Sequence, residues 1–139
     1  MPHALVVDDD THVCLAIRAL LEAKGIDAVL AESAEDGFKA FARFNFDVML
    51  VDIFMPKIDG LKAIKVFRQQ APKTPIIAMS GLVARYAPPQ QFDYFGMALK
   101  LGASCCLHKP FQTEQLLAAV ATCLRELPRR SAPMTAKVF

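Results

Sequence analysis

The stretch Ala4-Leu5-Val6-Val7-Asp8-Asp9-Asp10 joins four consecutive apolar residues to three consecutive carboxylates. An apolar run without alternation indicates a β-strand that is buried on both faces. The abrupt change to aspartate marks the end of that strand. Because strands covered on both faces are typical of parallel sheets with helical crossovers, this stretch predicts an α/β fold with acidic residues at the carboxyl edge of its sheet.

Apolar runs of strand length recur along the chain. Strands are expected over residues 4–7, 26–31, 48–51, 75–79 and 104–107, and each is followed by a segment with apolar residues three or four positions apart. Strict alternation of strands and helices implies parallel strands joined by helical crossovers. The sequence therefore predicts a doubly wound α/β fold with five strands and five helices.

The spacing of apolar residues also predicts which face of each helix is buried. Ser33 and either Asp10 or Thr11 are predicted N-caps, because short polar side chains accept hydrogen bonds from the first N–H groups of a helix. The expected buried residues are, in chain order, Val13, Ile17, Leu20 and Leu21; Phe38, Phe41 and Ala42; Leu61, Ile64 and Phe67; Phe92, Phe95 and Leu99; and Leu117, Val120, Ala121 and Leu124.

Length and composition predict one globular domain. The chain has 139 residues, of which 54% are hydrophobic and 22% charged, and this excludes a disordered or collagen-like chain. The net charge is +2, but residues 127–139 hold three of the 16 basic residues and no acid, which leaves 13 basic against 14 acidic residues elsewhere. A nucleic-acid partner is therefore not expected. We expect a domain over residues 1–127 and a flexible C-terminal tail over 128–139.

The cysteines and the apolar runs indicate the compartment. Cys14, Cys105, Cys106 and Cys123 form no C-x-x-C pair, so a metal finger or thioredoxin-like motif is not expected. Core thiols in a reducing cytoplasm fit this pattern, with Cys105 and Cys106 on opposite faces of their strand. The apolar runs are far shorter than the ~20 residues of a membrane helix, and no signal peptide is evident, so we expect a cytoplasmic protein without membrane contact.

Polar residues that can perform chemistry follow four of the predicted strands. Three aspartates (residues 8–10) follow the first strand, Asp52 ends the third, Ser80 ends the fourth and Lys109 follows the fifth. The carboxyl ends of parallel strands share one edge, so these side chains are expected within reach of one small ligand. Closely spaced carboxylates favour a bound cation, and Mg²⁺ prefers such ligands together with a phosphate. Lys109 supplies a positive charge and Ser80 a hydroxyl donor for an anionic group.

Four motifs stand in order at these strand ends: LVVDDD at residues 5–10, VDIFMPKIDG at 51–60, AMSG at 78–81 and KPF at 109–111. Together they resemble the receiver domain of bacterial two-component response regulators, and the resemblance extends from about residue 4 to residue 127. It implies the flavodoxin-like fold of that family, with strand order 2-1-3-4-5. It also implies a stand-alone, chemotaxis-regulator-like phosphoacceptor that is not an enzyme.

The resemblance assigns roles to individual residues. Asp52 is implied to accept a phosphoryl group from the phosphohistidine of a sensor histidine kinase or phosphotransfer protein. Lys109, with an expected cis bond to Pro110, would pair with Asp52 or with its phosphoryl oxygens, and Ser80 would hydrogen-bond the phosphoryl group. The implied Mg²⁺ ligands are Asp8, Asp9, Asp52 and the backbone carbonyl of Phe54.

Three features depart from the usual receiver pattern. Cys106 stands where the family has an aromatic switch residue, so a coupling of Ser80 to an aromatic ring lacks its usual partner. The segment after Ser80 is several residues longer than usual. Its excess, residues 82–91, is a lid over the site, a replacement for the missing aromatic residue, or a surface insertion without function. Phe54 and Leu82 add apolar bulk beside the site, from which we predict slow hydrolysis of the acyl phosphate.

Two alternative functions remain open. Cys106 keeps open a receiver-like interaction module that signals without phosphorylation. The pair Asp8-x-Asp10 also resembles the start of haloacid-dehalogenase-type phosphatases, in which the nucleophile lies on the first strand. That second hypothesis leaves the loop after Asp52 unexplained.

The expected output of the domain is a contact with a downstream protein. The resemblance places the family's usual output surface on the last two helices and the fifth strand. Tyr94 and Lys100 are the exposed candidates there, and their simplest interpretation is that they are solvated.

Overall fold

The structure, a computed structural model, describes residues 1–55, 58–81, 93–126 and 137–138. Its order of elements confirms the predicted alternation of strands and helices. The elements are β1 (His3–Val7), α1 (Thr11–Glu22), β2 (Asp27–Ala31), α2 (Ala34–Arg43), β3 (Val48–Asp52), α3 (Gly60–Gln70), β4 (Ile76–Ser80), α5 (Tyr94–Leu101), β5 (Cys105–His108), α6 (Thr113–Glu126) and β6 (Lys137–Val138).

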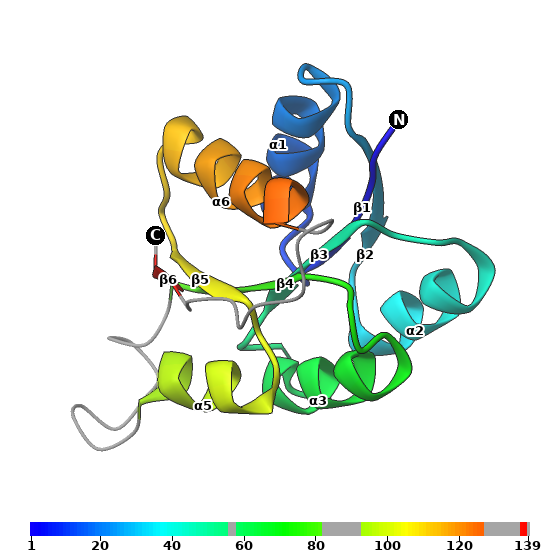
Figure 1. Ribbon diagram of the computed structural model, residues 1–139, viewed down its shortest axis with the longest axis vertical. Coiled ribbons are helices and arrows are strands. Elements are labelled where there is room, and N and C mark those ends of the chain that lie inside the picture. The colour runs from blue at the N-terminus through cyan, green and yellow to red at the C-terminus, as the bar shows by residue number, and fades with distance from the viewer. Residues whose placement is uncertain (56–57, 82–92, 127–136, 139) are drawn as a thin grey trace.

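The strands form one parallel sheet in the order β2-β1-β3-β4-β5-β6. The predicted order 2-1-3-4-5 of the flavodoxin-like fold is confirmed, and the two-residue strand β6 extends the sheet beyond β5. This strand lies within residues 128–139, which were expected to be a flexible tail; the rest of that segment lies outside the described residues. Figure 1 shows α1 and α6 on one face of the sheet and α2, α3 and α5 on the other.

The central strands are buried on both faces, which explains their uninterrupted apolar sequence. Ala4–Val7 and Val48–Val51 have no exposed surface. Their side chains alternate between two core layers, one under α2, α3 and α5 and the other under α1 and α6. Cys105 and Cys106 belong to different layers, as predicted, and all four cysteines are buried thiols.

The faces of α1 and α3 were predicted correctly, but that of α2 was predicted only in part. Phe38 and Phe41 are half-buried, and Ala42 is exposed, so its expected place in the core was wrong. The helix instead buries Ala34 and Gly37. A Cβ atom at Gly37 would lie 3.0 Å from a valine methyl group of β1, so small residues mark the side on which α2 approaches the sheet most closely.

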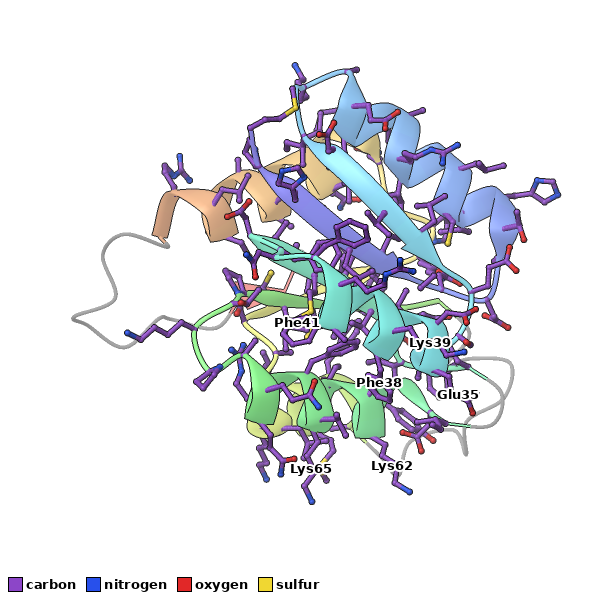
Figure 2. The ribbon with its side chains drawn as sticks, turned by 90° about the vertical axis from the view of Figure 1, so that its right-hand side faces the viewer. Glu35, Phe38, Lys39, Phe41, Lys62 and Lys65 are labelled. Carbon is purple, nitrogen blue, oxygen red and sulfur yellow. The ribbon has the colours of Figure 1, made fainter. Side chains whose placement is uncertain are left out.

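The two phenylalanines of α2 fill the space between α2 and α3. Phe38 and Phe41 both pack edge-to-face on Phe67, with ring centroids 5.0 and 5.8 Å apart. Figure 2 shows these rings pointing toward α3, whereas the exposed Lys62 and Lys65 of α3 point away from α2 into solvent. The α2–α3 contact is therefore formed by packed aromatic rings.

The buried face of α6 differs from the prediction by about one position. Ala121, which was expected in the core, is exposed, while Val120 is buried as predicted. Leu117 and Leu124 are half-buried. The remaining buried residues of the helix are Leu116, Ala119 and Cys123.

The predicted helix starts are formed by side-chain caps. Asp10, rather than Thr11, caps α1 by accepting hydrogen bonds from the backbone N–H groups of His12 and Val13. Ser33 caps α2 as predicted. Among the described helices, none combines the length and apolar character needed to span a bilayer.

Candidate functional site

The predicted site residues meet at the carboxyl edge of the sheet. β1 and β3 are neighbours, so Asp8 after β1 lies beside Asp52 at the end of β3. Lys109 is held next to the end of β4 because its backbone N–H donates to the carbonyl oxygen of Ser80 at 2.9 Å. A cavity of about 500 Å³ opens at this edge. Its lining includes Asp8, Asp9, Asp10, Asp52, Phe54, Gly81 and Lys109.

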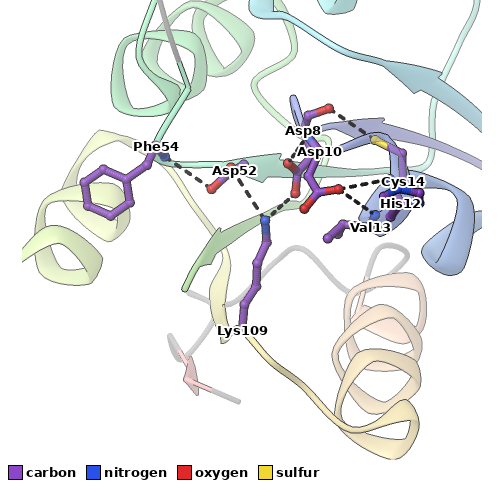
Figure 3. Close-up of polar contacts among 8 residues, drawn as sticks. All are labelled: Asp8, Asp10, His12, Val13, Cys14, Asp52, Phe54 and Lys109. Atoms are coloured by element: carbon purple, nitrogen blue, oxygen red, sulfur yellow. Dashed lines mark hydrogen bonds and ion pairs between the residues drawn. The ribbon is translucent and has the colours of Figure 1, made fainter. Parts of the chain in front are cut away.

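One lysine joins two buried carboxylates in this cavity. Lys109 Nζ donates to Asp8 Oδ2 and lies 3.5 Å from Asp52 Oδ2 (Figure 3). Asp8 is fully buried and Asp52 is 5% exposed. Lys109 is joined to Pro110 by a cis peptide bond, as expected. Charges removed from water are costly unless they are paired, so this arrangement is more than a solvated strand end.

Hydrogen bonds from nearby backbone N–H groups orient both carboxylates. Asp10 N–H donates to Asp8 Oδ1 at 2.9 Å, and Phe54 N–H donates to Asp52 Oδ1 at 3.2 Å. In both cases the donor lies two residues after the acceptor, in the turn that leaves the strand. Each carboxylate therefore has one oxygen fixed by the backbone and its other oxygen directed to Lys109.

Burial and crowding of like charges disturb the ionisation of the site. Burial raises the pKa of Asp52 to about 7; Asp8 adds to this effect and Lys109 opposes it. Burial and the neighbouring Asp8 also raise the pKa of Asp9. Burial alone would lower the pKa of Lys109, but the carboxylates of Asp52 and Asp8 together raise it above its ordinary value. The site therefore holds more negative charge than one lysine can neutralise.

The three predicted carboxylate ligands form one cluster. Asp8, Asp9 and Asp52 each offer an oxygen atom, and these atoms lie within 4.8 Å of one another. Hard oxygen donors with excess negative charge suit Mg²⁺, and the exposed Asp9 leaves one side open to water or phosphate. The donor set therefore fits the cation that the sequence predicts.

The sequence matches the family described as response regulator receiver domain over residues 4–121. The chain belongs to this family. Receiver domains act in two-component systems as phosphoacceptors rather than as enzymes, and Mg²⁺ and phosphorylation are typical of them. Membership rejects the alternative of a haloacid-dehalogenase-type phosphatase with Asp8 as nucleophile.

Other receivers resemble this one in sequence and fold. The transcriptional regulatory protein DltR of Streptococcus agalactiae serotype III is 36% identical over 116 residues, which are 84% of this chain and 49% of DltR. This receiver thus spans about half the length of the curated relatives it matches. The receiver domain of Francisella response regulator 1452 is 28% identical with a TM-score of 0.77, covering 91% of this chain and 98% of that one. The beryllofluoride-activated NtrC4 receiver domain dimer is 28% identical with a TM-score of 0.81, covering 91% and 99%.

Two glycines of this receiver are needed for close approach, and neither was among the predicted site residues. A Cβ atom at Gly60 would lie 1.9 Å from the backbone carbonyl oxygen of Asp52, and one at Gly81 would lie 2.5 Å from Lys109 Cβ. Both glycines stand inside the four receiver motifs, directly beside residues of the site. Their position in these motifs was the sequence signal that could have identified them as residues of the site.

The structure answers only some of the questions raised by the unusual features of this receiver. Ser80 is 1% exposed, and its Oγ has no hydrogen-bond partner among the described residues. Phe54 lines the cavity, but its ring points away from Asp52 (Figure 3), so the predicted slow hydrolysis stays a prediction. Residues 82–91, including Leu82, lie outside the described residues. Tyr94, which was expected to be solvated, is half-buried, whereas Lys100 is exposed.

Proposed function

We propose that Asp52 is the residue that receives the phosphoryl group, from the phosphohistidine of a sensor histidine kinase or phosphotransfer protein. The observation that carries the proposal is the contact of Lys109 with both Asp8 and Asp52 at the wall of the cavity. A half-buried lysine between two buried carboxylates is poised to bind an anion that is added to one of them. Family membership supports this assignment.

The transfer joins Asp52 directly to phosphorus. As a carboxylate oxygen of Asp52 forms the new P–O bond, the P–N bond breaks and its electron pair returns to the donor imidazole. Asp52 must be ionised to attack, and Lys109 favours that ionised form. Lys109 would then neutralise charge on the phosphoryl oxygens. The buried Ser80 hydroxyl, without a partner among the described residues, would donate to one of these oxygens.

The proposed metal ligands are Asp8, Asp9, Asp52 and the backbone carbonyl of Phe54. These residues would hold a Mg²⁺ ion, whose positive charge would offset the negative charge of the carboxylates and of the incoming phosphoryl group. Asp8 is oriented by Lys109 and by the backbone N–H of Asp10. The 4.8 Å limit on the spacing of the carboxylate oxygens supports this part of the proposal.

The phosphorylated domain would signal by a shift between two conformations that a downstream protein partner reads. Neither nucleic acid nor membrane is part of this proposal. A cytoplasmic location is supported by the four buried thiols, since such thiols persist in a reducing compartment.

Intact-mass spectrometry after incubation with acetyl phosphate and Mg²⁺ tests the proposal. One phosphoryl adduct is expected on the wild-type protein, and none on Asp52→Asn or in the presence of EDTA. Asp27→Asn is the matched control, because Asp27 is an exposed aspartate at the opposite end of the sheet. It should be phosphorylated like the wild type.

Two outcomes would overturn the proposal. An adduct that persists on Asp52→Asn would show that another residue is the acceptor. No adduct on a folded wild-type protein, with either acetyl phosphate or phosphoramidate as donor, would favour the interaction module that signals without phosphorylation.

A further inference from the structure

The first turn of α5 contacts both sides of the proposed phosphorylation site. Tyr94, the first residue of the helix, packs edge-to-face on Phe54, with ring centroids 4.7 Å apart and 66° between the ring planes. Phe95, the next residue, packs in the same way on His108, at 4.6 Å and 70°. We call Phe54, Tyr94, Phe95 and His108 the α5 aromatic clamp.

Each ring held by α5 belongs to a residue next to the site. Phe54 donates its backbone N–H to Asp52 Oδ1 at 3.2 Å. His108 directly precedes Lys109, whose ammonium lies 3.5 Å from Asp52. In the parallel pairing of β4 with β5, His108 stands opposite Ser80. The helix therefore reaches the proposed acceptor through one residue and the lysine through another.

The small side chain of Cys106 permits this arrangement. Cys106 is fully buried in the core layer against which Phe54, Tyr94 and Phe95 also pack. Its Sγ lies 3.9 Å from the backbone carbonyl oxygen of Phe95, so the start of α5 rests close to β5. In the core layer that holds Cys106, the aromatic rings thus come from α5 and from the loop after β3, rather than from position 106 of β5.

We infer that the α5 aromatic clamp transmits the state of Asp52 to helix α5. This inference rests on the proposed phosphorylation of Asp52. A phosphoryl group bonded to one carboxylate oxygen of Asp52 adds bulk and charge beside Phe54 N–H, which contacts Oδ1, and beside Lys109 Nζ, which lies near Oδ2. The turn carrying Phe54 and the residue after His108 must therefore adjust. Packed rings move as units rather than deform, so either adjustment displaces the first turn of α5.

A fluorine label on Tyr94 tests the inference. The chain has two tyrosines, so Tyr86→Phe leaves Tyr94 as the labelled residue when the protein is grown with 3-fluorotyrosine. Mg²⁺ with beryllofluoride, a non-transferable phosphoryl mimic, should shift the ¹⁹F resonance of Tyr94. Phe54→Leu keeps the backbone N–H and most of the apolar bulk but removes the ring. In that variant the beryllofluoride shift of Tyr94 should be lost.

A matched control removes a ring elsewhere in the same core layer. Phe38 packs edge-to-face on Phe67 at 5.0 Å, on the other side of α3. Phe38→Leu should therefore retain the beryllofluoride shift of Tyr94. Circular dichroism and urea midpoints establish that both variants are folded.

A second variant tests the helix side of the clamp. Tyr94→Leu removes the other ring of the pair, and the backbone amide of Gly96, which donates to Asp93 Oδ1 at 2.9 Å in the first turn of α5, serves as the reporter. The shift of its ¹H–¹⁵N resonance on adding Mg²⁺ and beryllofluoride should be present in the wild type and lost in Tyr94→Leu.

The outcomes separate this inference from the proposed function. A phosphoryl adduct without any shift at Tyr94 would overturn the clamp and leave Asp52 as the acceptor. An unchanged shift in Phe54→Leu would also overturn it. Absence of the adduct on the wild type would overturn the proposed function itself.

Discussion

Gly60 lies directly against Asp52: a Cβ atom on Gly60 would be 1.9 Å from the backbone carbonyl oxygen of Asp52. The N–H of Gly60 also donates to the carbonyl oxygen of Ile53 at 2.8 Å, so the start of α3 is anchored to the end of β3. Gly60→Ala is expected to lower the free energy of unfolding by on the order of 3 kcal/mol, because backbone rather than a side chain must move. Urea unfolding measures this change.

Gly25→Ala is the control for that substitution. Gly25 has φ of +78° but nothing within 4 Å of an added Cβ atom, so only backbone strain of about 1 kcal/mol is expected. Equal losses in the two variants would contradict the argument from close approach.

Asp52 is expected to make the metal-free protein less stable as the pH rises. Burial raises its pKa from 3.8 to about 7, so between these values the folded state retains a proton that the unfolded chain has released. The free energy of unfolding therefore falls through this interval and levels off above it. Asp52→Asn should match the wild type near pH 4 and exceed its stability near pH 8 by on the order of 2 kcal/mol.

Urea unfolding in EDTA at both pH values measures the difference. Lys109 contributes nothing to it, because its pKa is raised above 10.5 and the ammonium stays protonated in both states over this range. A stability difference between wild type and Asp52→Asn that does not change with pH would contradict the prediction.

Removal of Asp9 is expected to weaken Mg²⁺ binding without unfolding the protein. Asp9 is exposed, so Asp9→Asn should leave the metal-free melting temperature nearly unchanged. In the wild type, Mg²⁺ at a hundredfold excess over its Kd should add about 2.7 kcal/mol of stability. To reach the same stabilisation, the Asp9→Asn protein should need at least about tenfold more Mg²⁺. Loss of a residue that only contacts a metal ligand already weakens metal binding by about tenfold. Thermal melts over a Mg²⁺ titration, with Asp27→Asn as control, measure this; identical titrations would exclude Asp9 as a ligand.

Introducing an aromatic residue at position 106 of β5 is expected to destabilise this receiver. Cys106 is fully buried, and the backbone of Phe95 already lies 3.9 Å from its Sγ. Cys106→Tyr should therefore cost about 1–3 kcal/mol by overpacking. Cys106→Ala should cost no more than about 1 kcal/mol, since it removes one atom. Urea midpoints compare the two, and a Cys106→Tyr protein as stable as the wild type would show that the position has room for a ring.

The sheet edge could be predicted from sequence because the relevant signal is local. A strand buried on both faces appears as an uninterrupted apolar run, and its first polar residue marks the carboxyl end. That rule is enough to place Asp8, Asp52, Ser80 and Lys109 at one edge of the sheet. The cis bond before Pro110 followed only from the resemblance, since spacing alone does not distinguish cis from trans.

The helix faces and the α5 contacts were less predictable because they depend on tertiary packing. In α2 the small residues Ala34 and Gly37, not the large apolar ones, mark the side closest to the sheet. Tyr94 was expected to be solvated because nothing in its local sequence reveals that α5 brings it onto Phe54. Such contacts arise between segments about forty residues apart, beyond the reach of a periodicity argument.

The division of the thiols between the two core layers has a practical consequence. Cys106 lies under α2, α3 and α5, whereas Cys14, Cys105 and Cys123 lie under α1 and α6. A buried thiol reacts with an alkylating reagent only when its surroundings open, so variants with one remaining thiol would time the local opening of each layer separately. The rate of thiol alkylation thus reports opening separately on each side of the sheet. An event that loosens α5 alone would change only the alkylation rate of Cys106.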